Sequence, residues 1–267
     1  MALRRTLVRL VVLAAAMLPA LGATRLLVSV ADPKSGRPIG ALQAADFAVT
    51  DGDRVREVEA VQAKTGGIDV LLLLDASMVG DAVQGAAPDL IAQLDGKEQM
   101  ALVTYDSSAS MVLDFTSSKQ ALSRALSGIK YGNSPRALDG IYAAVDGGFE
   151  HATLRRVVLL LTAGLEGSGR VNEKSVIELA RKNSVSIYPL FLKGYAKGMF
   201  ERLARQTGGV ALNLKDISKG PKAGAAVFET MRSYYELTIS GNLPPTEKLR
   251  VEVKRPGKYF TSALVVD

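Results

Sequence analysis

An acid and a hydroxyl follow directly on an aliphatic run in the first third of the sequence. Val70 to Leu74 is unbroken aliphatic, and Asp75, Ser77 and Gly80 come after it. Such a run is typical of a strand that is buried on both faces, in the middle of a parallel sheet. Asp75 then lies at the carboxyl end of the strand, where open α/β sheets bind their ligands. A carboxylate and a hydroxyl at this position are oxygen donors of the kind that a hard cation such as Mg²⁺ requires.

More apolar runs and an intervening helical pattern accompany this strand. Met100 to Asp106 and Val157 to Gly164 repeat the pattern of an apolar strand that ends in small or polar residues. Between them, apolar residues recur at helical spacing from Leu138 to Phe149, as in a helix that packs on a sheet. Alternating strands and helices are typical of βαβ construction. We therefore predict a doubly wound, mostly parallel, Rossmann-like α/β sheet over residues 66–233.

Alternating patterns at both ends of the chain predict antiparallel strands with one solvent-exposed face. They run from Leu26 to Val30 near one end, and from Tyr235 to Ile239 and Leu249 to Val253 near the other. The N-terminal half of this set has too few apolar residues to form a core alone. We predict that residues 24–65 and 234–267 pair into one small antiparallel β-sandwich, into which the α/β domain is inserted.

The three apolar strands and their endings resemble a von Willebrand factor type A (vWA) domain. Asp75-Ala76-Ser77 is similar to the first loop of that family, which reads Asp-x-Ser-x-Ser. Residues 100–106 resemble the second strand, and residues 157–164 resemble the fourth, which normally ends in Thr-Asp-Gly. The flanking segments resemble a bacterial secreted, VWFA-related subgroup. The resemblance implies a non-catalytic protein-binding module with a metal-ion-dependent adhesion site (MIDAS). In such a site a divalent cation, usually magnesium, is bound by the domain, and a carboxylate of the partner completes its coordination shell.

The sequence departs from the family at most of the cation's ligand positions. Asp75 and Ser77 are kept, but Val79, Pro135 and Ala163 stand at the other three of the family's five positions. None of these three side chains carries an oxygen, so magnesium would be held mostly by water. We therefore expect a degenerate MIDAS, no bound Mg²⁺ and no other cofactor.

Two more residues, Ser134 and Glu166, could lie at the rim of this vestigial site, together with Asp75 and Ser77. Each has a structural alternative. Asp75 could accept hydrogen bonds from amides of the following turn or cap the helix from Asp81 onward. Ser134 followed by proline is a preferred helix start, with serine at the N-cap. Val79 and Ala163 could fill the vacated space with apolar volume.

The start of the chain has the pattern of a secretory signal peptide, residues 1–23. Arginines open it, Leu10 to Leu21 forms an apolar core, and Ala20 to Ala23 supplies small residues for cleavage. The alternative is an uncleaved N-terminal anchor, although the core is short for a membrane span. The sequence has no cysteine, which suits a bacterial exported protein. We expect a secreted or periplasmic protein of the bacterial envelope with no membrane span after signal cleavage.

Other chemistries find little support in the sequence. The leader arginines account for half of the formal charge of +6, and the scattered remainder argues against a nucleic-acid partner. The glycine-rich residues 164–169 lack the spacing of a phosphate-binding loop. His151 is the only histidine and no Gly-x-Ser-x-Gly motif exists, so we predict no hydrolase chemistry. Asp106 and the serines after it are expected to form an exposed turn.

Two functions remain open. The first is a non-catalytic, metal-independent vWA-type module that binds a protein of unknown identity around Asp75, Ser77, Ser134 and Glu166. The alternative is a structural scaffold component of a bacterial envelope assembly, in which the β-strands of the flanking module form the contact surface.

Overall fold

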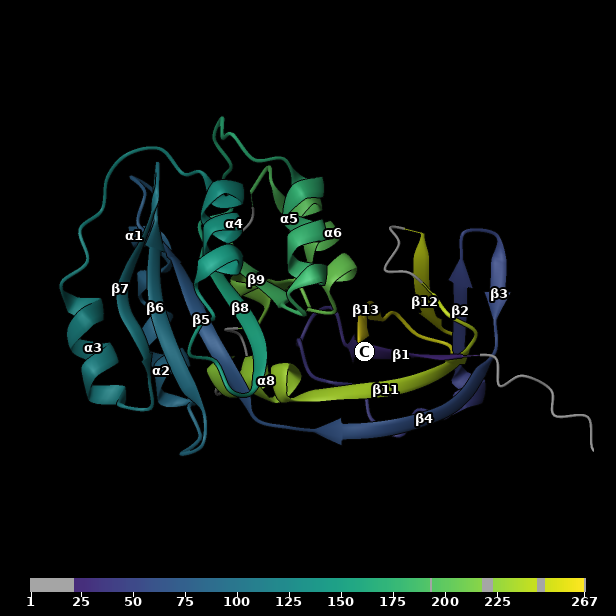
Figure 1. Cartoon of the computed structure of the whole chain (residues 1–267). Coiled ribbons are helices and arrows are strands. Elements are labelled where there is room, and N and C mark those ends of the chain that lie inside the picture. Colours follow the sequence, from purple (N-terminus) through teal and green to yellow (C-terminus); the bar gives the residue numbers. More distant parts are fainter. Residues whose placement is uncertain (1–21, 193, 218–222, 244–247, 267) are drawn as a thin grey trace, which may run out of the picture.

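The chain is described by a computed structural model, which covers residues 22–192, 194–217, 223–243 and 248–266. All but the last two residues of the predicted signal peptide lie outside these ranges. Figure 1 shows a sheet covered by helices at one side of the molecule and strands without helices at the other. Within the described ranges, no helix has the length and hydropathy needed to cross a membrane.

A six-stranded sheet with the order β10-β9-β8-β5-β6-β7 forms the larger lobe. Neighbouring strands are parallel except β7, which is antiparallel to β6. The predicted mostly parallel, doubly wound sheet is therefore confirmed, with the aliphatic run in an interior strand. The strands are β5 (Ile68–Asp75), β6 (Gln99–Tyr105), β7 (Ala109–Thr116), β8 (Arg155–Thr162), β9 (Ser186–Phe191) and β10 (Leu212–Asn213).

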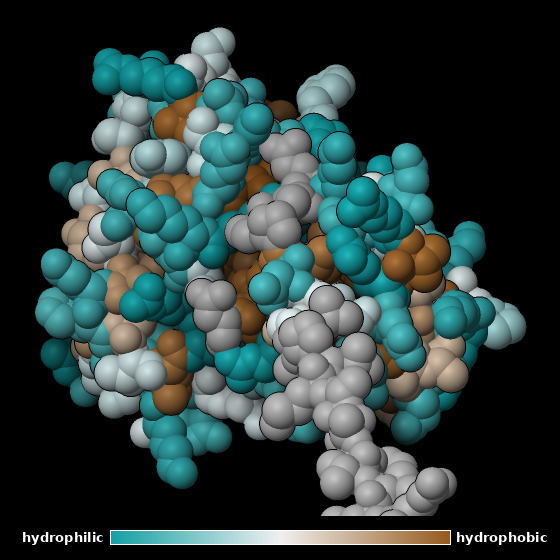
Figure 2. Space-filling view, turned by 45° about the vertical axis from the view of Figure 1, so that its right-hand side comes forward, coloured by the Kyte–Doolittle hydropathy of each residue, from teal (hydrophilic) through white to brown (hydrophobic). Residues whose placement is uncertain are grey.

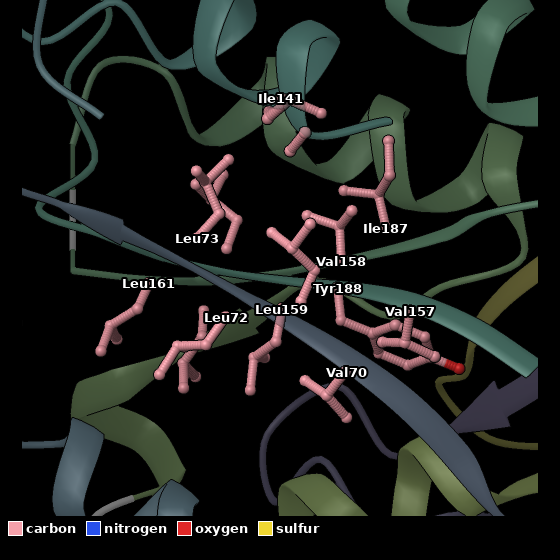
Figure 3. Packing of buried hydrophobic residues seen from close by; sticks show 14 of the residues in the cluster. Val70, Leu72, Leu73, Ile141, Val157, Val158, Leu159, Leu161, Ile187 and Tyr188 are labelled. Atoms are coloured by element: carbon pink, nitrogen blue, oxygen red, sulfur yellow. The ribbon is translucent and has the colours of Figure 1, made fainter. Parts of the chain in front are cut away.

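Helices cover both faces of this sheet because its interior strands are apolar on both faces. Leu73, Val158 and Ile187 lie on the side of Ile141, which belongs to α4 (Figure 3). Val70, Leu72 and Leu159 point to the opposite side. α4, α5 and α6 pack side by side on the face that Ile141 covers. α2 packs against α8. The helices are α1 (Asp81–Gln84), α2 (Ala87–Ala92), α3 (Lys119–Ser127), α4 (Ala137–Gly147), α5 (Glu173–Lys182), α6 (Lys197–Thr207), α7 (Leu214–Ile217) and α8 (Ala223–Arg232).

Two antiparallel sheets, with the orders β13-β1-β11-β4 and β12-β2-β3, form the smaller lobe. The first joins the two ends of the chain, because Leu26 in β1 lies opposite Leu237 in β11. A separate apolar cluster that includes Val49, Tyr235 and Val251 fills the space between the two sheets. The strands are β1 (Ala23–Ala31), β2 (Phe47–Asp51), β3 (Arg54–Arg56), β4 (Val58–Thr65), β11 (Ser233–Ser240), β12 (Leu249–Val253) and β13 (Phe260–Val266), with a 3₁₀ turn at Ala44–Asp46.

A buried ion pair lies where the chain passes between the lobes. Arg232, the last residue of α8, donates from Nε to Glu98 at 2.8 Å, and its carbonyl accepts from the Gly66 amide at 3.1 Å. Glu98 is 1% exposed and also accepts from the amides of Ile68 and Asp95. The two crossings between the lobes are thus held together by one carboxylate.

The lobes also touch along the end of α6. Ser29 in β1 bonds to the Gly208 carbonyl at 2.8 Å and to the Tyr188 hydroxyl at 3.2 Å. Gly208 ends α6 with a φ of +75°, and a Cβ there would lie 2.9 Å from that of Leu264 in β13. Glycine therefore satisfies both the left-handed helix end and the close approach of the lobes.

Figure 2 shows hydrophilic side chains over most of one face of the molecule, with hydrophobic side chains between them.

Candidate functional site

Asp75 is fully buried at the carboxyl end of β5 and surrounded by hydrogen-bond donors. Its Oδ1 accepts from the Ser77 amide at 3.0 Å and from the Ser77 hydroxyl at 2.6 Å. Its Oδ2 accepts from the Ala163 amide at 3.1 Å and from the Thr162 hydroxyl at 3.3 Å. These four donors occupy the lone pairs that a cation would need. Of the two local alternatives for Asp75, the bond to the following turn is observed, whereas α1 has no side-chain cap.

The hydrogen bonds continue below Asp75 into the sheet. The Tyr105 hydroxyl donates to Oγ1 of Thr162 at 2.8 Å, and the Gly164 amide donates to the same oxygen at 3.1 Å. Burial, and then the nearby charge of Asp75, raise the pKa of Tyr105 well above its usual value. Tyr105 therefore stays a neutral donor, and the network links β5, β6 and β8.

Main-chain hydrogen bonds join the loops above this network. The Gly132 amide donates to the Ala76 carbonyl at 2.9 Å, and the Met78 amide donates to the Asn133 carbonyl at 3.0 Å. The Gly167 amide donates to the Pro135 carbonyl at 2.6 Å. We name the surface formed by residues 76–80, 129–136, 163–172 and 194–196 the carboxyl-edge face. Main-chain hydrogen bonds therefore fix its loops relative to one another.

The helix start predicted at Ser134 and Pro135 is wrong. α4 begins at Ala137 with Arg136 at the N-cap and no capping side chain of its own. Oε2 of Glu166 instead accepts from the amides of Ala137 at 2.8 Å and Leu138 at 3.2 Å. Ser134 is exposed. A carboxylate from a distant loop thus satisfies the first amides of α4, which local sequence cannot reveal.

Burial dominates the protonation of Glu166. It raises the pKa to about 7 from the model-compound value of 4.5, against the lowering effect of the amides of Leu138 and Ala137. The folded protein therefore binds this proton more tightly than the unfolded chain does. The contribution to stability is greatest below pH 4.5 and is lost as the pH rises toward 7.

Glu166→Gln is expected to remove this part of the pH dependence. An amide oxygen still accepts the helix amides but does not ionise, so urea unfolding of the variant should vary less than that of wild type between pH 5 and 8. Glu166→Ala should lose about 1 kcal/mol, because the cap is gone. Equal slopes of stability against pH for wild type and Glu166→Gln would show that Glu166 does not titrate in this range.

The side chains at the family's ligand positions do not fit a magnesium ion. Val79, Pro135 and Ala163 supply no side-chain oxygen, and the oxygens of Asp75 and Ser77 are bonded to one another. Over the part of the chain that the structure describes, no three His, Cys, Asp or Glu residues converge on a common point. Near-octahedral ligation of magnesium requires more oxygen ligands than these side chains supply.

Two exposed hydrophobic residues on this face were not identified from the sequence. Met78, between Ser77 and Val79, is 67% exposed, and Tyr195, in the loop after β9, is fully exposed. β5 and β9 run parallel through β8, so both loops leave the same edge of the sheet. The pattern of the sequence gave no signal for either, because exposure depends on how the loops fold.

The remaining polar candidates are engaged elsewhere. The His151 ring is exposed, and its Nδ1 lies within hydrogen-bond distance, 2.8 Å, of a carboxylate oxygen of Asp114 in β7. Asp106 lies in the turn between β6 and β7, as predicted, and accepts from the Asn133 side chain at 2.7 Å.

The doubly wound sheet with an Asp-x-Ser loop at its carboxyl edge defines the class of the larger lobe. The family model described as von Willebrand factor type A domain matches residues 69–230, and the chain belongs to this family. Domains of this family are generally interaction or adhesion modules and typically non-catalytic. The predicted resemblance to a vWA domain is thereby confirmed.

Solved structures agree with this fold. Proximal thread matrix protein 1 from the mussel byssus is 18% identical, with a TM-score of 0.55, over 68% of this chain and 51% of that one. A structure of the same protein with a zinc-occupied MIDAS motif is 19% identical, with a TM-score of 0.55, over 68% and 50%. This chain thus spans about half the length of that protein, and the similarity shows the fold alone. A search of curated proteins gives no match.

Proposed function

We propose that this protein is a non-catalytic, metal-independent vWA-type module that binds a protein partner through the carboxyl-edge face. The observation that supports the proposal is the set of four protein donors on Asp75, which satisfy this carboxylate from within the chain. Asp75 and Ser77 are fully buried and shape the loop. Contact with the partner falls to the exposed residues of this face, Met78, Ser134 and Tyr195, with the partly buried Glu166 at their side.

Metal independence is tested with a matched gain of ligands. Isothermal titration of wild type with Mg²⁺, Mn²⁺ and Ca²⁺ should give no binding heat, and EDTA should not change the melting temperature. Val79→Ser, Pro135→Thr and Ala163→Asp combined restore oxygens at the three lost positions and should introduce Mg²⁺-dependent stabilisation. Binding to wild type that disappears in Asp75→Asn would overturn the proposal.

The binding surface is tested with a photoreactive residue. Benzoylphenylalanine in place of Met78 should crosslink a protein from an envelope fraction, and Tyr195→Ser should abolish the adduct because large exposed side chains dominate interfaces. The control position is Val55 in β3, which is 80% exposed on the smaller lobe. Adducts at position 55 and none at position 78 would instead support the scaffold alternative.

The smaller lobe is proposed to support the larger lobe, which carries the binding face. We infer that residues 66–233 are an inserted binding unit, and that residues 24–65 and 234–267 form its support. The leader pattern of residues 1–23 supports a secreted or periplasmic location in a bacterial envelope. Mass spectrometry of the exported protein tests this, since a mature N-terminus near Ala23 is expected and retention of Met1 would favour the anchor.

A further inference from the structure

A groove of about 610 Å³ lies between α6 of the larger lobe and the strands of the smaller lobe, and none of its lining residues belongs to the carboxyl-edge face. Arg202 and Arg205 of α6 line one side, Val251 and Glu252 of β12 line the other, and Ala263 of β13 lies between. Figure 1 shows β13 between α6 and β12, in agreement with the contacts that β13 makes with both. We name this the β13 groove.

The floor of the groove is the free edge of a strand. Among the described strands, β13 pairs only with β1. The Thr261 carbonyl accepts from Nη1 of Arg205 at 3.1 Å, so the backbone of Thr261 faces away from β1. Groups on one edge of an antiparallel strand recur at every second residue, and Ala263 therefore also presents its amide and carbonyl to the groove.

The opposite wall has the same character. The Lys254 amide donates to the Asp46 carbonyl at 2.8 Å, toward β2. By the same alternation, Val251 and Val253 turn their backbone groups away from β2 and toward the groove. β12 and β13 are consecutive, yet they belong to different sheets and do not pair with each other. Two sets of main-chain donors and acceptors thus border one cavity.

The side chains of the groove favour a negatively charged occupant. Three arginines line it, Arg202, Arg205 and Arg250, against one acid, Glu252. Arg202 is neutralised by Glu173 at 2.8 Å, whereas Arg205 lies over the Phe260 ring at 4.1 Å with a neutral carbonyl as its hydrogen-bond partner.

The groove also contains a buried hydroxyl group that could bind an occupant. Ser262 lines the groove at 3% exposure, and its Oγ has no hydrogen-bond partner within the described part of the chain. Buried hydroxyls are seldom left unpaired, so this atom indicates hydrogen-bonding capacity that the chain itself does not use.

We propose that the β13 groove binds an extended, acidic peptide segment of a partner protein, which pairs with β13 as an added strand. Main-chain hydrogen bonds to the Thr261 amide and to Ala263 provide affinity, and carboxylates facing Arg205 and Arg250 provide selectivity. The site is separate from the carboxyl-edge face, so either proposal can fail without the other.

The test measures the binding of a fluorescein-labelled peptide, Thr-Val-Asp-Val-Asp-Val-Thr, to the purified protein by fluorescence anisotropy. Ala263→Pro removes the edge amide without touching a bond to β1, and should weaken binding at least about tenfold. Ala263→Val, which keeps the amide, is the matched control and should bind as wild type does. Arg250→Glu should weaken binding about three- to fivefold, the size of an exposed ion pair.

Three results would overturn the proposal. The first is equal binding by Ala263→Pro and wild type, with urea unfolding showing that both are folded. The second is equal affinity for a peptide with lysine in place of aspartate. The third is concentration-dependent dimerisation in sedimentation that Ala263→Pro abolishes, because the groove would then hold a second copy of this chain.

Discussion

Glu98→Ala is expected to lower the free energy of unfolding by about 3–5 kcal/mol, the usual cost of breaking a buried ion pair on one side. The substitution leaves the guanidinium of Arg232 without its carboxylate in a site where the arginine side chain is only 25% exposed. It also removes the acceptor for the amides of Ile68 and Asp95 at 3.3 and 3.0 Å. Urea unfolding at pH 7 measures the loss.

The location of this pair enlarges the effect. Arg232 ends α8 directly before β11, and Ile68 begins β5 directly after the crossing from β4. Arg232 also donates to the Gln93 carbonyl at 2.8 Å at the end of α2. Removing Glu98 therefore loosens both crossings between the lobes together, and we expect a lower melting temperature for the whole chain.

A surface pair and a double variant provide the controls. Glu178, paired with Lys174 at 3.8 Å and 61% exposed, should tolerate Glu178→Ala within about 0.5 kcal/mol. Glu98→Leu combined with Arg232→Met should cost less than the sum of the two single substitutions, because no charge is left unpaired. Additive losses would show that the two side chains do not act as a pair.

Asp75→Ala is expected to destabilise the protein by about 3 kcal/mol, because it leaves several buried donors without an acceptor. The amides of Ser77 and Ala163 and the hydroxyls of Ser77 and Thr162 all point to this carboxylate. The measurement is chemical unfolding in EDTA, so that no cation contributes.

The sign of this effect discriminates between two roles for Asp75. A carboxylate that serves a cation is surrounded by other oxygens, and its removal in EDTA relieves repulsion. A carboxylate that serves the fold is surrounded by donors, and its removal costs stability. Asp81→Ala, an exposed acid in the first turn of α1, is the control and should change stability by less than about 0.5 kcal/mol. An Asp75→Ala variant more stable than wild type would contradict the structural role.

The sequence by itself determined the type of sheet and the family. The unbroken run Val70 to Leu74 requires cover on both faces, and hydrophobic pattern alone carries that information. The sequence also shows that Val79, Pro135 and Ala163 have no side-chain oxygen, because the presence of a ligand atom follows from residue type alone.

The tertiary structure alone decided how the polar groups pair. Glu166 caps α4 from 29 positions away in the chain. The local preference for a helix start at Ser134 and Pro135 was therefore outweighed by a contact from a distant loop. Glu98 and Arg232 are separated by 134 positions, and no periodicity links them. Hydrophobic burial repeats along a strand or helix and can be predicted from local pattern, whereas a hydrogen bond between loops depends on where the packed sheet places their ends.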